Sequence, residues 1–210
     1  MDEQQRARLE AENGFRQLEQ GIEIIRYYLE PGRPFALRPG LILDLQKIAV
    51  DGLEPYPGQW RKSQVAISKS SHQPPGPHLV EGLVTEMCEY VNNNLHVKTA
   101  FHLSAYVMWR HNWIHPFADG NGRTSRVLSY IVLSLCTGYA LPGSPTIPEQ
   151  IQEDRTGYFR ALEAADKAWA DGNKLDISVM EEMLMGMLAK QLLSVISTAA
   201  GKSIEEQRDP

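Results

Sequence analysis

Residues 115–126, which read His-Pro-Phe-Ala-Asp-Gly-Asn-Gly-Arg-Thr-Ser-Arg, constrain the structure of this chain more than any other segment. Apolar residues recur at helical spacing on both sides of it, so the segment joins two predicted helices. Pro116 disfavours continuation of the first helix, and Gly120 and Gly122 permit the left-handed conformations of a tight loop. The second helix is expected to begin near Arg123. The sequence therefore predicts a helix, a glycine loop and a second helix.

The polar residues of this loop point to phosphate chemistry. Successive backbone N–H groups in a glycine loop at a helix N-terminus form a concave site for an anion. Arg123 and Arg126 lie three residues apart, on one face of the first helical turn. The His115 side chain is suited to act as a general base for a hydroxyl nucleophile, and Asp119 offers an oxygen ligand for Mg²⁺. Together these groups predict a site that transfers a phosphate-containing group.

Other interpretations of the segment fit less well. Residues 122–125 resemble the end of a P-loop, but the lysine is absent and a helix rather than a strand precedes the loop. His111 and His115 could form a metal pair, but the glutamate of the H-E-x-x-H motif is missing. A plain helix-turn-helix would leave the charged residues without a purpose. Phe117 is apolar among polar neighbours, and we interpret it as the anchor that holds the loop on the core.

These residues resemble the Fic-domain signature, H-P-F-x-(D/E)-G-N-G-R-x-x-R, at all nine specified positions. Most Fic proteins transfer the AMP moiety of ATP to a Ser, Thr or Tyr hydroxyl of a target protein. The resemblance implies that His115 is the base and Asp119 the Mg²⁺ ligand. It implies that the nucleotide phosphates are bound by Gly120, Asn121, Gly122, Arg123 and Arg126. Doc-like kinases of the family carry lysine in place of the second glycine, so Gly122 favours AMP transfer.

A second resemblance lies upstream, in residues 58–75. Trp60–Ser68 is the best strand candidate of the chain, because Val65 and Ile67 alternate with small or polar residues. Residues 58–61, 65–67 and 72–75 match the pattern of the Fic flap, a short hairpin ahead of the core helices. The flap edge, Val65, Ala66 and Ile67, could bind an extended target segment as an added strand. An ordinary hairpin that covers the core would show the same pattern.

The N-terminal helix carries a partial match to a regulatory motif. Many Fic proteins are inhibited by a helix of pattern (S/T)-x-x-x-E-(G/N), whose glutamate pairs with the second arginine of the signature, here Arg126. Glu12 and Asn13 match the end of this pattern, but Arg8 stands where Ser or Thr is required. Glu12 is therefore a candidate inhibitory residue, and a solvated surface glutamate is an equal alternative.

Composition limits the partners of the chain. Its 210 residues carry a net charge of −5 and a pI near 5.7, so we expect no nucleic acid partner. No apolar segment is long enough to span a membrane and no signal sequence begins the chain, so we expect a cytoplasmic protein. Cys88 and Cys136 lack metal-ligand spacing and are expected to be reduced thiols. The expected partners are a target protein with a modifiable hydroxyl, a second copy of the chain, or an antitoxin-like regulator.

The fold expected from periodicity and resemblance is an all-α Fic fold with a small β-hairpin flap. We divide the chain into an N-terminal helix (1–40), a Fic core with the flap (41–170) and a C-terminal helix (171–210), and we expect one helix from Pro148 to about Trp169. The expected activity is Mg²⁺- and ATP-dependent protein adenylyltransferase. A phosphoryl or phosphocholine transferase, an enzyme that removes AMP, and a nucleotide-binding module without turnover remain open.

Overall fold

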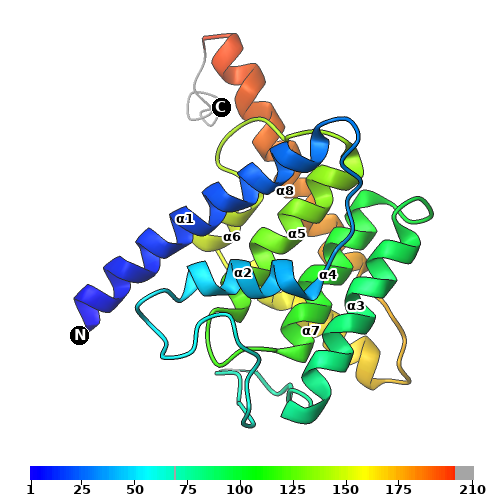
Figure 1. The fold of residues 1–210 in the computed structure, drawn as a ribbon. Helices are drawn as coiled ribbons and strands as arrows, with labels where there is room; N and C mark the ends of the chain where they lie inside the picture. The colour runs from blue at the N-terminus through cyan, green and yellow to red at the C-terminus, as the bar shows by residue number, and fades with distance from the viewer. Residues whose placement is uncertain (69, 202–210) are drawn as a thin grey trace.

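The structure is a computed structural model that describes residues 1–68 and 70–201, and over these residues it is all-helical (Figure 1). Its helices are α1 (Glu3–Leu29), α2 (Pro39–Ala49), the 3-10 helix η1 (Pro77–Leu79), α3 (Val80–Asn94), α4 (Ala100–Ile114), α5 (Asn121–Thr137), α6 (Ile147–Glu153), α7 (Thr156–Ala170) and α8 (Ser178–Ala199). The predicted all-α class is confirmed.

Helix α5 lies at the centre of the bundle, with α1, α2, α4 and α6 packed around it (Figure 1). Its packing against α4 is close because small side chains meet there. The hydroxyl oxygens of Ser104 and Ser129 lie 2.7 Å apart, and both residues are fully buried. Because α4 ends at His115 and α5 begins at Asn121, this pair of helices fixes both ends of the signature loop.

Helix α1 packs lengthwise on α2 and α5 through a narrow stripe at four-residue spacing. The buried residues of this stripe are Asn13, Gln17, Gly21 and Ile25. A Cβ atom on Gly21 would lie 2.7 Å from Val127 Cγ1, so this position allows the two helices to approach closely. The buried Gln17 amide donates to Leu45 O of α2 and to Thr124 Oγ1 of α5. The stripe therefore sets the register of α1 beside the signature loop.

The predicted strand and hairpin at residues 60–68 are not shown, because the structure contains no strand within residues 1–68 and 70–201. The two arms of this segment are joined instead by a side chain, since the Gln64 amide donates to Pro74 O at 2.7 Å. Pro74 and Pro75 have no N–H to give to a ladder, and an isolated two-stranded ribbon is marginally stable. We refer to residues 60–75 as the flap segment.

The single helix predicted from Pro148 to Trp169 is wrong, because the structure divides it into α6 and α7. The break lies at Asp154 and Arg155. Asp154 has an extended conformation, and its carboxylate accepts a hydrogen bond from the backbone N–H of Thr156 at 2.9 Å. A side chain that satisfies a free N–H at the start of a helix favours a new helix over continuation of the old one.

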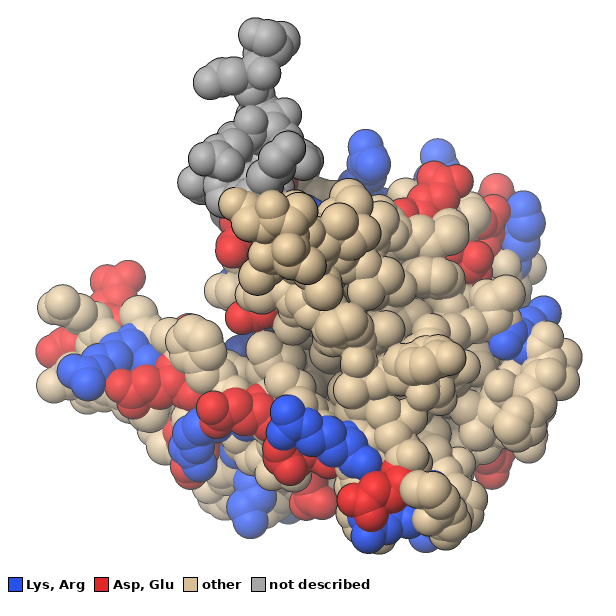
Figure 2. Space-filling view, turned by 90° about the horizontal axis from the view of Figure 1, so that it is seen from above, with Lys and Arg blue, Asp and Glu red and all other residues tan. Residues whose placement is uncertain are grey.

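The surface carries mixed charge. On the face shown in Figure 2, acidic and basic side chains alternate along a band beside a broad uncharged area, and no basic stripe is present there. Among the residues that the structure describes, no helix combines the length and apolar composition needed to cross a membrane.

Candidate active site

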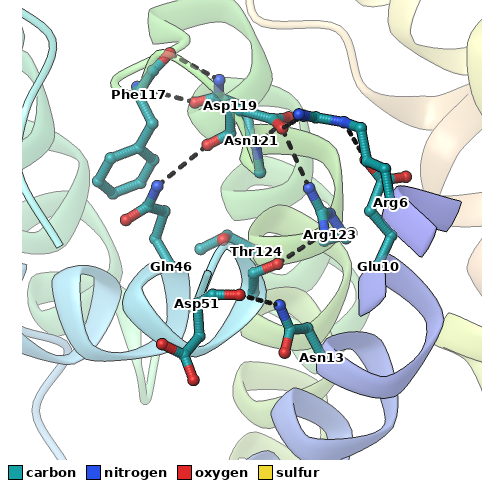
Figure 3. A network of polar contacts seen from close by, with 12 residues as sticks. Arg6, Glu10, Asn13, Gln46, Asp51, Phe117, Asp119, Asn121, Arg123 and Thr124 are labelled. Atoms are coloured by element: carbon teal, nitrogen blue, oxygen red, sulfur yellow. Dashed lines mark hydrogen bonds and ion pairs between the residues drawn. The ribbon is translucent and has the colours of Figure 1, made fainter. Parts of the chain in front are cut away.

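The signature loop is held in shape by its own backbone and by one amide side chain (Figure 3). His115 has a left-handed conformation (φ 51°, ψ 60°) that ends α4. Gly120 has φ 82°, and a Cβ atom there would lie 2.8 Å from Val50 Cγ1. The Asn121 side chain accepts from Phe117 N at 3.0 Å and donates to Phe117 O at 2.9 Å. Asn121 therefore clamps the loop and leaves only its backbone N–H free to contact a ligand.

His115 is a neutral imidazole with one nitrogen available. Burial lowers its pKa from 6.5 to about 4, and the Arg61 cation contributes in the same direction. Its Nδ1 lies 3.3 Å from Asn112 O. A carbonyl oxygen can only accept, so Nδ1 carries the proton and Nε2 carries the lone pair. A neutral histidine with a free Nε2 is the form that a general base requires.

The start of α5 provides unpaired N–H groups beside His115. The N–H of Thr124 bonds to Gly120 O, whereas those of Asn121, Gly122 and Arg123 have no hydrogen-bond partner among the described residues. Unpaired N–H groups at a helix N-terminus attract anions. Gly122 has no side chain to cover this surface, and a Cβ atom there would lie 3.4 Å from Arg126 Nη1.

The two signature arginines lie in different environments. Arg123 donates to Ala49 O at 2.6 Å and to Asp119 Oδ2 at 3.4 Å. Arg126 is 7 % exposed and donates to Gln152 Oε1 at 2.9 Å, and no carboxylate of the described residues pairs with it. Burial lowers the Arg126 pKa. A buried guanidinium without a counter-ion favours a strongly charged anion such as a polyphosphate.

Asp119 is placed by three neighbours (Figure 3). Its carbonyl oxygen accepts from the Gln46 amide at 3.1 Å, and its Oδ2 pairs with Arg123 and with Arg6 of α1, the latter at 3.2 Å. The described residues contain no group of three or more His, Cys, Asp or Glu side chains that could hold a metal ion. One carboxylate still fits Mg²⁺, because this ion is commonly held by one or two carboxylates together with substrate phosphates and waters.

The contact between Arg6 and Asp119 should compete weakly with a divalent cation. We expect Arg6→Gln to tighten Mn²⁺ binding in the presence of ATP by at most about fivefold, because exposed pairs contribute only about 0–1 kcal/mol. Both side chains of the pair are partly exposed, at 44 % and 35 %. Titration calorimetry with Mn²⁺ measures the change. Arg8→Gln is the matched control on the same helix, and equal affinities in both variants would show that Arg6 does not compete.

Arg61 was not predicted as a site residue, although it is 5 % exposed and lies directly behind His115. Its guanidinium donates to His115 O at 2.7 Å, to Ile114 O at 3.3 Å, and to two carbonyl groups of the flap segment, those of Ser63 and Pro75. Its own N–H donates to Pro116 O. An arginine between a tryptophan and an alternating apolar run could have indicated a buried cation, but the sequence does not reveal carbonyl partners so distant in the chain.

Replacing Arg61 should loosen the flap segment and the His115 turn together. We expect Arg61→Gln to lower the free energy of unfolding by about 1.5–3 kcal/mol, because hydrogen bonds from a charged donor to buried acceptors are lost. Urea unfolding of this variant provides the measurement, and Lys62→Gln, which changes an exposed neighbour, is the control. A loss as small as that of Lys62→Gln would contradict a role for Arg61 in holding the turn.

The remaining predicted residues lie apart from the loop or at its edge. Glu12 pairs with Arg8 at 2.8 Å, and no pair between Glu12 and Arg126 is present among the described residues. Inhibition by Glu12 stays a prediction. In the flap segment Val65 and Ile67 are half-buried and Ala66 is exposed. Phe117 is fully buried and its ring centre lies 5.0 Å from that of Trp60.

The sequence around the signature loop matches a known protein family. Residues 36–133 match the model of the Fic/DOC family. Residues 36–133 are thus similar to a Fic domain, and the signature loop lies within this segment.

The curated relatives that the chain matches bear the name protein adenylyltransferase Fic. The relative from Drosophila persimilis is 32 % identical over 131 residues, which make up 60 % of this chain and 23 % of the relative. The relative from Aedes aegypti is 33 % identical over 130 residues, which make up 60 % of this chain and 24 % of the relative. The chain thus spans about a quarter of the length of these relatives.

Solved structures show the same fold. A Fic-domain signaling protein from Bacteroides thetaiotaomicron superposes with a TM-score of 0.72 at 23 % identity, covering 91 % of this chain and 74 % of that protein. Fic-1 from C. elegans superposes with a TM-score of 0.65 at 18 % identity, covering 86 % of this chain and 51 % of that structure. Both likenesses extend beyond the 98 residues of segment 36–133.

Proposed function

We propose that the chain is a Mg²⁺-dependent protein adenylyltransferase that moves AMP from ATP to a Ser, Thr or Tyr hydroxyl of a target protein. The observation that carries this proposal is the buried Arg126, which has no carboxylate partner and lies beside the unpaired N–H groups of α5 and the neutral His115. The relatives named protein adenylyltransferase Fic support the reaction type.

Each residue of the loop has a defined task in this reaction. His115 Nε2 accepts the proton of the target hydroxyl while the hydroxyl oxygen forms a bond to the α-phosphorus. The bond from the α-phosphorus to the bridging oxygen breaks, and pyrophosphate leaves. The N–H groups at the start of α5 stabilise the charge that develops on the phosphate oxygens. Arg123 binds the β-phosphate and Arg126 the γ-phosphate. Mg²⁺ held by Asp119 would neutralise part of the charge of the polyphosphate.

ATP labelled at two positions distinguishes the candidate reactions. AMP transfer deposits the label of α-³²P ATP on protein and leaves that of γ-³²P ATP in solution. Deposition of the γ label would instead show a phosphoryl transferase, as in the kinase branch of the family. No deposition, with retained ATP binding by calorimetry, would overturn the proposal. Release of AMP from an adenylylated target by water would then show an enzyme that removes AMP.

We further propose that the flap segment binds the target backbone. The N–H of Ala66 has no hydrogen-bond partner among the described residues, and the residue is exposed. An extended target segment could pair with this edge and bring its hydroxyl over His115. A second copy of the chain and a separate regulator remain further candidate partners.

Ala66→Pro tests this docking mode. Proline removes the N–H that an added strand would use, so modification of a protein target should fall, by about tenfold if one ladder bond of about 1 kcal/mol and its neighbours are lost. ATP affinity should not change, because the nucleotide phosphates are bound by the signature loop. Ala66→Ser keeps the N–H and is the control. Parallel loss of ATP affinity in Ala66→Pro would assign the segment a structural role only.

A further inference from the structure

A cavity apart from the signature loop is lined by residues of α3, α4 and α7. It has a volume of about 290 Å³ and is lined by Glu86 and Tyr90 of α3, Tyr106, Trp109 and Arg110 of α4, and Trp169 of α7, with Leu175 of the following loop. None of these residues belongs to the candidate active site. The size approaches the lower end of the range for small-molecule sites.

Arg110 is an unpaired buried cation in the wall of this cavity. It is 8 % exposed, its Nη1 is buried without a hydrogen-bond partner, and no carboxylate of the described residues pairs with it. Its guanidinium carbon lies 4.3 Å from the ring centre of Trp113 and 5.1 Å from that of Trp169. Cation–π contacts of this kind contribute about 0.5–2 kcal/mol each and offset part of the cost of burial. They provide no negative charge, and Glu86, a carboxylate that also lines the cavity, acts on Arg110 through its charge but forms no ion pair with it.

The other lining residues are aromatic side chains and one carboxylate, and they indicate which further groups a ligand would carry. The rings of Tyr90 and Tyr106 pack on each other with centres 4.0 Å apart, those of Trp109 and Trp169 lie 5.5 Å apart, and all four residues line the cavity. Trp109 is fixed in place because its Nε1 donates to Asp166 at 2.8 Å. Glu86 is exposed and forms no ion pair among the described residues. The cavity thus combines a buried cation, aromatic walls and a separate carboxylate.

We propose that this cavity binds a small carboxylate with an aromatic body, and that an aromatic α-amino acid is the form that uses all three features. The ligand carboxylate would pair with the Arg110 guanidinium, whose fork matches it. The ring would lie against the half-buried Tyr90 and Trp169 side chains, and the ammonium group would face Glu86. The proposal does not depend on the adenylyltransferase reaction.

Three probes that share one ring separate these contributions. They are phenylalanine, phenylacetate, which lacks the ammonium group, and phenethylamine, which lacks the carboxylate. The indole N–H signals of the four tryptophans, assigned by Trp→Phe substitution, report binding by NMR titration. Trp109, Trp113 and Trp169 should shift, whereas Trp60, which packs on Phe117, should not. We expect phenethylamine to bind at least tenfold more weakly than phenylalanine.

Two variants complete the experiment. Arg110→Met keeps an apolar body and removes the cation, and it should weaken phenylacetate about 10- to 100-fold while ATP affinity stays unchanged. Glu86→Gln alters an exposed residue, and it should weaken phenylalanine but not phenylacetate. Equal phenylacetate affinity in Arg110→Met, or no shift of the three tryptophan signals with any probe in the wild-type chain, would overturn the proposal. The wild-type series decides the matter even if Arg110→Met does not fold.

Discussion

Replacing His115 with alanine should reduce AMP transfer to a protein target by about 10²–10⁴-fold, the usual contribution of a general base. ATP affinity should change little, because in the proposed site the N–H groups of α5 and Arg126 would bind the nucleotide without the imidazole. AMP transfer measured with α-labelled ATP gives the first quantity and calorimetry the second. His96→Ala, which changes an exposed histidine outside the loop, is the matched control. Activity within a few-fold of wild type would remove His115 from the role of base.

The pH dependence adds a second measurement on the same residue. A histidine can act as a base only when neutral, so if His115 is the base the rate should fall as the pH drops through its pKa. Burial lowers this pKa from 6.5 to about 4, and the acidic limb of kcat/KM should therefore lie near pH 4 rather than near 6.5. Because kcat/KM reports the free enzyme, a limb near 6.5 would contradict a lowered pKa of His115.

The signature loop could be located from the sequence because its chemistry is local. Proline, two glycines and the paired arginines lie within twelve residues, and their conformational preferences alone predict a helix-loop-helix. The structure places His115 at the end of α4 and the unpaired N–H groups at the start of α5 in this arrangement. Most of the helices followed from apolar periodicity, which is strong in α1.

Features that depend on distant contacts could not be found in this way. The Arg61 side chain reaches carbonyl groups more than fifty residues away, and Arg6 reaches Asp119 across 113 residues. Alternation at Val65 and Ile67 predicted a strand, but a strand also needs a partner that can donate, and the prolines opposite cannot. The break between α6 and α7 depends on one capping carboxylate, which an apolar pattern does not register.

Phe117 should carry the largest stability effect of the loop. Its side chain is fully buried and packs on Trp60 and His111, with ring-centre distances of 5.0 and 5.9 Å. Truncation of a buried phenylalanine to alanine costs about 3–5 kcal/mol, since the transfer free energy is lost and a cavity remains. We expect Phe117→Ala to lower the free energy of unfolding by this amount in urea. Phe159→Ala, at a residue that is 51 % exposed, should change it by less than about 0.5 kcal/mol.

The same substitution should also uncouple the loop from its clamp. The Asn121 side-chain amide bonds to the backbone N–H and C=O of residue 117. Alanine at this position no longer anchors the backbone on the core, so the Asn121 amide loses partners of fixed position. ATP binding and AMP transfer should then both fall in the fraction that remains folded, whereas His115→Ala affects transfer alone. Phe117→Leu retains most of the apolar volume. It should therefore bind ATP with wild-type affinity although its free energy of unfolding stays below that of wild type. Wild-type ATP affinity in a folded Phe117→Ala protein would show that Asn121 and the glycines hold the loop without the buried ring.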